Sequence, residues 1–227
     1  ASLGEFLLKM GAKIKGLGTR TIIIDGVNKL NGAEHTIIPD RIEAGTFLVA
    51  ASITKSRLLL KKTQPEHLQS VLDLLSQIGA VIVVEEDKIE INMKQKNIKP
   101  ADFTTQPYPG IPTDMQAQFM VLNAIAQGNS IVVETIFENR FMHVLELQRM
   151  CADISIRGNT AYITGVKKLH SAPVMATDLR ASAALVLAGL VAEGETHIDR
   201  IYHIDRGYEC IENKLSHLGA KVARIET

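Results

Sequence analysis

Cysteine is scarce in this 227-residue chain: only Cys151 and Cys210 are present, and they form no CxxC motif. Two isolated cysteines cannot supply the disulfide framework of a small secreted protein, and their scarcity suits a reducing compartment. No apolar run is long enough to span a membrane, and the first residues lack the basic region and long apolar core of a signal peptide. We therefore expect a soluble, cytoplasmic protein with no membrane partner.

An excess of charge of one sign is also missing. Lys and Arg total 25, as do Asp and Glu, so the formal net charge is zero. This balance gives no support to a general nucleic-acid-binding role, which needs a basic face. The seven histidines show no HExxH or other ligand spacing, so no metal site is indicated. Gly16-Leu17-Gly18 is not a dinucleotide fingerprint, because no helix follows it, and neither a Gly-rich phosphate loop nor a serine elbow occurs.

Internal repetition is what the chain does have. The pair Thr113-Asp114 opens an almost wholly apolar run that closes at Gly128, and Thr177-Asp178 opens a second one that closes at Gly194. A looser copy begins at Pro39-Asp40. Repetition of this kind fixes the architecture, and it also provides an internal control, because a copy that departs from the others points to function.

A second repeated element is a dipeptide of one small residue and alanine, which follows a leucine-rich amphipathic segment. It starts at Gly11, Gly79, Cys151 and Gly219, so its spacings are 68, 72 and 68 residues. β-branched residues then alternate around a turn, which predicts a hairpin. The turn residues are Gly18, Asp87-Lys88 and Gly158-Asn159.

Together the two elements predict βαβαββ units and an α+β fold. Because the helices after Asp114 and Asp178 are apolar nearly all round, they must be enclosed by protein, which puts helices inside and sheets outside. We expect residues 38–227 to form one domain of three such units. Residues 1–37 have the helix and hairpin that end a unit, so we expect them to be a remnant of a preceding domain in a longer protein.

The aspartates at the helix starts have two interpretations, which do not exclude each other. Asp114 and Asp178 can act as N-caps, whose carboxylates accept helix amide hydrogens. Alternatively, the helix amides hold a carboxylate ready to accept a proton during catalysis. For Asp40, which follows Pro39 in the loosest copy, the N-cap interpretation is favoured.

Comparison of the copies singles out Arg206. Thirteen residues before each small-Ala pair stand Glu66, Glu138 and Arg206. An acid suits a helix start, whereas an arginine there opposes the helix dipole. Such a cation makes sense if it faces an anionic ligand, although a structural role stays open.

Four strings in order identify a family: PTDMQAQF (112–119), TIFENRFMHV (135–144), VMATDLRASAALVLAG (174–189) and DRIYHIDRGYE (199–209). They resemble the enolpyruvyl transferases, and specifically the branch that uses UDP-N-acetylglucosamine as acceptor. The resemblance implies two domains, each of three βαβαββ units with helices inside. It also implies transfer of enolpyruvyl from phosphoenolpyruvate to the sugar 3′-hydroxyl in peptidoglycan synthesis, and hence a role in cell-wall biogenesis, cell shape and division. No metal or organic cofactor is expected.

The same resemblance assigns roles to residues of this chain. Asp114 is expected to contact the sugar and act as the base, Asp178 to assist proton movement, and Arg206 to hold the anionic groups of phosphoenolpyruvate. The backbone of Ile136 is expected to meet the UDP-sugar. Weaker candidates around them are Glu138, Arg140, Arg41, Leu179 and Arg180.

The chain departs from the family in length. Family chains are about twice as long, and their N-terminal half carries a mobile loop with a reactive cysteine. Neither Cys151, which we expect to be a packed small residue, nor Cys210, expected on the last amphipathic helix, matches that position. We therefore expect the chain alone to be inactive without that half. Two alternatives stay open: another acceptor such as shikimate 3-phosphate, or a non-catalytic module that binds an anion or a protein.

Overall fold

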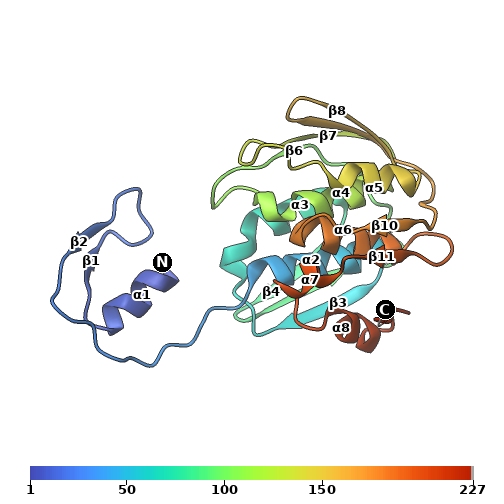
Figure 1. Ribbon diagram of the computed structural model, residues 1–227. Helices are drawn as coiled ribbons and strands as arrows, with labels where there is room; N and C mark the ends of the chain where they lie inside the picture. The colour runs from blue at the N-terminus through green and yellow to red at the C-terminus, as the bar shows by residue number, and fades with distance from the viewer. Residues whose placement is uncertain (226–227) are drawn as a thin grey trace. The chain divides into compact units, whose positions relative to one another are not determined.

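The computed structural model describes residues 1–225, and the chain separates into two compact units at Pro39–Asp40. The first unit consists of helix α1 (Ser2–Lys9) and an antiparallel pair of strands, β1 (Lys13–Lys15) and β2 (Ile23–Asp25) (Figure 1). Among the described residues α1 buries no side chain, and Ile23 and Ile24 of β2 are more than half exposed. This unit is a helix and hairpin whose apolar side chains are largely exposed.

The second unit contains three successive copies of one pattern. The first copy comprises α2 (Arg41–Ile53), β3 (Arg57–Lys61), the 3₁₀ helix η1 (Pro65–Leu68), α3 (Gln69–Ile78), β4 (Val81–Glu85) and β5 (Lys88–Asn92). The second comprises β6 (Phe103–Thr104), the 3₁₀ helix η2 (Thr113–Met115), α4 (Gln116–Ala124), β7 (Asn129–Val133), α5 (His143–Arg149), β8 (Asp153–Arg157) and β9 (Thr160–Thr164). The third comprises β10 (Pro173–Met175), α6 (Leu179–Gly189), β11 (His197–Asp199), α7 (Tyr202–Asp205) and α8 (Ile211–His217).

The sheets follow from this order. In the second copy β6 runs parallel to β7, while β7, β9 and β8 are antiparallel, which gives the strand order β6-β7-β9-β8. The first copy contributes the antiparallel sheet β3-β5-β4, and the third contributes the parallel pair β10-β11. The predicted α+β fold is confirmed, and its βαβαββ unit is complete in the second copy. In the hairpin β4–β5 the two turn residues are Glu86 and Asp87 rather than the predicted Asp87 and Lys88, because Lys88 already belongs to β5.

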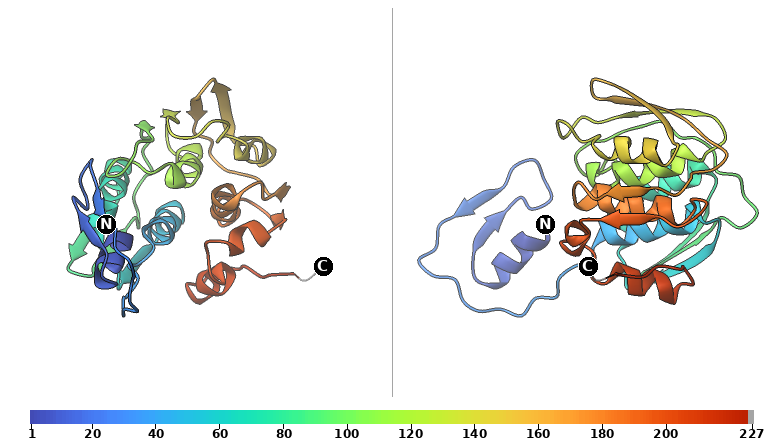
Figure 2. Two further views of the ribbon diagram at one scale, coloured as in Figure 1. Left: turned by 60° about the vertical axis from the view of Figure 1, so that its left-hand side comes forward. Right: turned by 45° about the vertical axis from the view of Figure 1, so that its right-hand side comes forward.

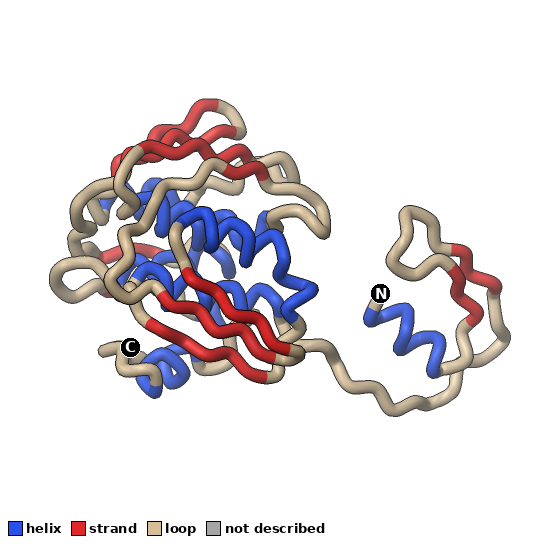
Figure 3. Tube along the Cα trace, turned by 180° about the vertical axis from the view of Figure 1, so that it is seen from behind, coloured by secondary structure: helices blue, strands red, loops and turns tan. Residues whose placement is uncertain are grey.

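The three apolar helices lie inside, as predicted. Helices α2, α4 and α6 contact one another, and nearly all their residues are buried on every side. Helix α2 lies close to the start of α4: a Cβ on Gly45 of α2 would lie 2.9 Å from the side chain of Met115, the residue before α4. The sheet containing β7 and β8 covers one side of the helices, and the β3-β5-β4 sheet covers another (Figures 1, 2 and 3).

The repeated small-Ala dipeptide marks the C-terminal end of each amphipathic helix. Its first residue has a left-handed backbone in each copy, with φ values of +97°, +114°, +67° and +97° at Gly11, Gly79, Cys151 and Gly219. Its alanine N–H donates to the carbonyl five residues earlier, so that Ala80 bonds Leu75 and Ala152 bonds Leu147. This pattern is the Schellman motif, which satisfies the last helix carbonyls and favours glycine. The dipeptide therefore recurs because each amphipathic helix ends in the same way.

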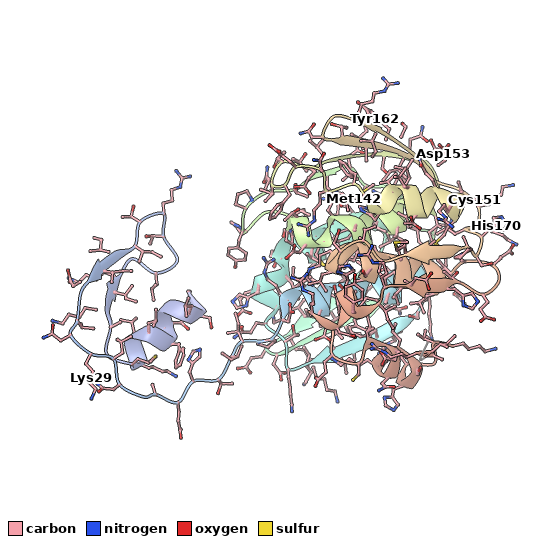
Figure 4. The ribbon with its side chains drawn as sticks, viewed as in Figure 1. Lys29, Met142, Cys151, Asp153, Tyr162 and His170 are labelled. Atoms are coloured by element: carbon pink, nitrogen blue, oxygen red, sulfur yellow. The ribbon has the colours of Figure 1, made fainter. Side chains whose placement is uncertain are left out.

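Both predictions about the cysteines need correction. Cys151 is exposed rather than packed, and it follows the C-cap of α5, Met150, with a left-handed backbone. It lies at the opposite end of α5 from Met142 (Figure 4). Cys210 is also exposed, and it immediately precedes α8 with φ of +45° instead of lying within that helix. Among residues 1–225, no helix is long and apolar enough to cross a membrane.

Candidate functional site

Two of the three helix-start aspartates are N-caps. Asp40 Oδ1 accepts hydrogen bonds from the N–H groups of Ile42 at 2.7 Å and Glu43 at 3.3 Å, at the start of α2. Asp178 Oδ1 accepts from the N–H groups of Arg180 at 2.8 Å and Ala181 at 2.9 Å, at the start of α6. Each carboxylate satisfies amides that the helix leaves unpaired. The N-cap interpretation is confirmed for both residues.

Asp114 behaves differently, and its N-cap interpretation is wrong. It lies within the 3₁₀ helix η2, and α4 begins only at Gln116, so in the described structure its carboxylate caps no helix amide. Instead, Oδ1 accepts from Arg140 Nη2 at 2.9 Å and Oδ2 accepts from Arg180 Nη2 at 3.4 Å. The extra 3₁₀ turn carries the carboxylate past the helix end. Asp114 thus shares its charge with two arginines, and its side chain remains 38% exposed.

Six of the predicted site residues line one open cavity of about 320 Å³. They are Asp114, Arg140, Asp178, Leu179, Arg180 and Arg206. Three arginines and two aspartates give the lining a formal charge of +3 − 2 = +1. The arginines come from three different segments, whereas the apolar contribution is Leu179. A polar cavity with a positive excess suits an anionic ligand with several hydrogen-bonding groups.

Arg206 lies at the cavity, but not at the start of a helix as predicted. Arg206 is the C-cap residue of α7, not a helix-start residue, so its charge agrees with the helix dipole. Glu138 lies in a turn five residues before α5, so it too is not at a helix start. Sequence periodicity located the equivalent positions but did not show that short turns replace the helix starts. Arg206 nevertheless lies in the cavity lining and is exposed.

Three predicted residues lie outside the lining of this cavity. Ile136 and Glu138 belong to the segment between β7 and α5, and both are exposed. Arg41 is the first residue of α2, and its guanidinium lies 5.6 Å from the ring centre of Tyr108. The same β7–α5 segment brings Arg140 to the cavity, where its guanidinium also stacks 4.9 Å from the ring centre of Phe137.

Glu134, which was not predicted from the sequence, holds this segment in place. Glu134 is 2% exposed, and its carboxylate accepts from the hydroxyl groups of Thr105 and Thr113, both at 2.8 Å. It also accepts from the N–H groups of Ile136 at 2.8 Å and Phe137 at 3.1 Å. All four donors are uncharged. One carboxylate therefore joins the residue before Asp114 to the segment that carries Arg140.

His143 was also missed. It is 1% exposed at the start of α5, and burial lowers its pKa to about 4, because the charged ring would be poorly solvated. The Asp178 carboxylate and a hydrogen bond to the Arg140 backbone partly oppose this shift, whereas the Arg140 charge adds to it. A buried, neutral imidazole thus lies near Asp178 and Arg140, which both line the cavity. Glu134 and His143 stand in or beside the string TIFENRFMHV, but only burial distinguishes them from its exposed polar residues.

The cavity contains no indication of a metal. Within the described part of the chain, no three His, Cys, Asp or Glu side chains are grouped so as to hold a metal ion. The arginines and aspartates that converge on the cavity are suited to bind an organic anion and to move protons on it.

Comparisons with known proteins extend this description. Residues 2–215 match the family model described as EPSP synthase (3-phosphoshikimate 1-carboxyvinyltransferase). The chain is 56% identical over 225 residues to UDP-N-acetylglucosamine 1-carboxyvinyltransferase of Coxiella burnetii, strains Dugway 5J108-111 and RSA 493 / Nine Mile phase I. The match covers 99% of this chain but 52% of each relative, so the chain spans about half the length of these relatives.

Solved structures give the same fold. The enolpyruvyl transferase NikO from Streptomyces tendae superposes with a TM-score of 0.85 at 29% identity, covering 94% of this chain and 51% of that one. EPSP synthase from Acinetobacter baumannii superposes with a TM-score of 0.75 at 19% identity, covering 99% of this chain and 55% of that one. At that lower identity the similarity concerns the fold alone.

Proposed function

The chain belongs to the EPSP synthase family of enolpyruvyl transferases, and from this premise we propose that it forms part of a UDP-N-acetylglucosamine enolpyruvyl transferase. The proposed reaction moves the enolpyruvyl group of phosphoenolpyruvate to the 3′-hydroxyl of the UDP-sugar and releases phosphate. The 56% identity to relatives with that acceptor in their name supports this choice. Because the chain spans about half of those relatives, the activity belongs to a longer protein.

The observation that carries the proposal is the environment of Asp114. Of the three helix-start aspartates, Asp40 and Asp178 have an oxygen committed to helix amides, whereas Asp114 projects into a cavity beside Arg140 and Arg180. A part-exposed carboxylate among cations can accept the proton of a bound hydroxyl group. The excess of arginine would at the same time bind carboxylate and phosphate groups.

In the proposed reaction, addition is followed by elimination. The sugar oxygen bonds to C2 of phosphoenolpyruvate while its proton passes to Asp114, and C3 gains a proton to become a methyl group. The C2–O bond to phosphate then breaks and the methyl group loses a proton, which gives the enolpyruvyl ether and free phosphate. Arg206 would bind the anionic groups of phosphoenolpyruvate, and the free oxygen of Asp178 would assist proton movement. No cofactor is required.

The other predicted residues have supporting roles in this proposal. The backbone of Ile136 and the side chain of Leu179 would contact the UDP-sugar. Arg140 and Arg180 would hold Asp114, and Glu138 and Arg41 would lie at the rim. The hydrogen bonds of Arg140 and Arg180 to Asp114 support their assignment.

We further propose how the chain fits into the longer protein and into the cell. Residues 1–37 would belong to a neighbouring domain, and residues 38–227 would form a transferase domain of three repeats. The other half of the longer protein would complete the site with its cysteine-bearing loop, so the chain alone would be inactive. The product would enter peptidoglycan synthesis in the cytoplasm, where the enzyme serves cell-wall biogenesis and division.

Phosphate release tests the proposal directly. The full-length protein is incubated with phosphoenolpyruvate and UDP-N-acetylglucosamine, and residues 1–227 are assayed in parallel. We expect turnover by the full-length protein that depends on both substrates, and none by the 227-residue chain. A full-length protein that binds neither substrate would instead indicate a non-catalytic module.

A second acceptor has a specific observation in its favour, because the matching family model is described by the shikimate-pathway activity. Shikimate 3-phosphate is therefore assayed against the UDP-sugar at equal concentration. Preference for shikimate 3-phosphate would overturn the acceptor while leaving the reaction type intact.

A further inference from the structure

A buried polar cluster lies directly beneath Asp114. It consists of Thr46 on α2, Gln118 on α4 and Tyr208 between α7 and α8, each at most 2% exposed. The Tyr208 hydroxyl lies 2.9 Å from Thr46 Oγ1 and 3.4 Å from Gln118 Nε2. Two of the three inner helices and the segment after α7 thus meet at one phenol oxygen.

The hydroxyl hydrogen of Thr46 sets the direction of these hydrogen bonds. Thr46 Oγ1 donates its hydrogen to the carbonyl of Ile42 at 2.8 Å, so its oxygen must accept from Tyr208. A phenol has one hydrogen, and Tyr208 uses it on Thr46. Its lone pairs then face Gln118 Nε2 and Arg180 Nη1, both at 3.4 Å.

These two donors are the groups that support Asp114. Arg180 donates from Nη1 to Tyr208 and from Nη2 to Asp114 Oδ2 at 3.4 Å, and its guanidinium lies 5.7 Å from the Tyr208 ring centre. Gln118 Nε2 also donates to the backbone carbonyl of Asp114 at 2.9 Å. The Tyr208 hydroxyl therefore contacts both the guanidinium and the amide that hold Asp114.

The same residue holds the segment that presents Arg206. Tyr208 is two positions after Arg206, and its ring packs in an apolar cluster with Phe47, Ala183, Val186, Ile204, Ile211 and Leu215. Between them, Gly207 lies so close to Leu179 that an added Cβ would be 3.0 Å from its methyl group. The ring fixes the Arg206 segment, and the hydroxyl fixes Arg180.

We propose that Tyr208 is a positioning residue of the transferase, whose hydroxyl sets the orientation of Arg180 against Asp114 while its ring holds the Arg206 segment. The inference rests on the proposed function. A phenylalanine would fill the apolar cluster equally well, so packing alone does not account for the buried hydroxyl. Burial of a hydroxyl is tolerated here because it has hydrogen-bond partners.

The test is Tyr208→Phe in the full-length protein, which removes one oxygen and retains the ring. We expect kcat for phosphate release to fall roughly 10- to 100-fold, the effect of a lost hydrogen bond to a charged group. The KM for phosphoenolpyruvate should change less than threefold, because the ring still holds the Arg206 segment. Thr46→Val, which removes the acceptor of the Tyr208 hydrogen and also an acceptor 3.2 Å from Gln118 Nε2, should lower kcat in the same direction.

Val186→Ala is the matched control, because it loosens the same apolar cluster and leaves the hydroxyl in place. Its kcat should equal that of the parent once the folded fraction is measured by urea unfolding. Parental kinetics in Tyr208→Phe, or equal losses in Tyr208→Phe and Val186→Ala, would overturn the inference alone. A parent protein without phosphate release would overturn the proposed function, and the inference with it.

Discussion

Arg140 Nη2 donates a hydrogen bond of 2.9 Å to Oδ1 of Asp114, across 26 positions of sequence. The bond joins the 3₁₀ helix η2 to the segment between β7 and α5, and both partners lie in the cavity lining. The arginine side chain is 18% exposed and the aspartate side chain 38%. A pair so placed is accessible to a ligand, which could take over either partner.

Substitution of Asp114 should affect mainly the reaction rate, whereas substitution of Asp178 should also lower stability. Asp114→Asn in the full-length protein should lower kcat roughly 10²- to 10⁴-fold, the range for loss of a general base, with little change in stability. Asp178→Ala should cost about 1 kcal/mol of unfolding free energy, because α6 loses its N-cap. Phosphate release and urea unfolding measure the two effects. As a control, Asp40→Ala should reproduce the stability loss without touching the cavity, and full activity in Asp114→Asn would contradict its role as the base.

Arg206→Ala should weaken binding of phosphoenolpyruvate. Loss of a charge-assisted contact to an anion should raise its KM by about 10- to 100-fold. The control is Arg157→Ala, which removes an exposed arginine from β8, where it stacks on Tyr162 away from the cavity lining. Steady-state kinetics on the full-length protein distinguishes them; equal KM values in the two variants would show that Arg206 does not contact this substrate.

The hydrogen bond from Thr113 to Glu134 offers a test of how Asp114 is held. Thr113→Val deprives Glu134 Oε2 of its donor and should lower kcat/KM by about 10-fold, since the residue that follows is Asp114. Thr113→Ser keeps the hydroxyl and should remain within about threefold of the parent. If the serine and valine variants behave alike, the hydroxyl is not what matters at this position.

His143 should make stability depend on pH. Its pKa of about 4 in the folded protein lies below the ordinary value of 6.5, so the unfolded state binds the proton more readily. The contribution of the neutral His143 to the unfolding free energy is therefore fully present above pH 6.5. It falls by about 3 kcal/mol as the pH drops from 6.5 to about 4. Urea unfolding of the parent and of His143→Gln across this range isolates the contribution. Identical pH profiles would contradict it.

The Schellman caps predict a stabilising substitution. Cys151 has φ of +67° where the equivalent positions hold glycine, so Cys151→Gly should raise the unfolding free energy by about 1 kcal/mol. Gly219→Ala should lower the unfolding free energy by about as much, because alanine is strained at its φ of +97°. An added Cβ would meet no atom within 4 Å, so the loss would report the backbone strain alone. Urea midpoints report both changes. Phosphate release should be unaffected in both, and a destabilised Cys151→Gly would disprove the backbone explanation.

The fold was largely predictable because its determinants are periodic. All-round apolar segments predicted the inner helices, and β-branched alternation predicted the hairpins β4–β5 and β8–β9. The near-regular spacing of the small-Ala pairs predicted where the amphipathic helices end, and the left-handed backbone at Gly79 and Cys151 supplies the physical reason for it. Short 3₁₀ turns such as η2 were not predicted, since three residues carry too little pattern.

The site was predictable in composition but not in geometry. The strings that resemble the family contained Asp114, Arg140 and Arg206, and the structure brings these three to one cavity. Which oxygen faces which donor depends on the 3₁₀ turn before α4. Buried supports such as Glu134 and Tyr208 carry no sequence signal, because an exposed polar residue has the same letter as a buried one.

The three helix-start aspartates show how copies of one structural unit can place the same residue type in different surroundings. Asp40 and Asp178 are N-caps, and each has an oxygen that accepts hydrogen bonds from backbone amides. At Asp114 one additional 3₁₀ turn precedes the helix, so the same residue type does not cap the helix amides. The difference lies in the local backbone rather than in the amino acid. An alignment of the copies shows three identical letters, although only at Asp114 do both carboxylate oxygens bond arginines instead of helix amides.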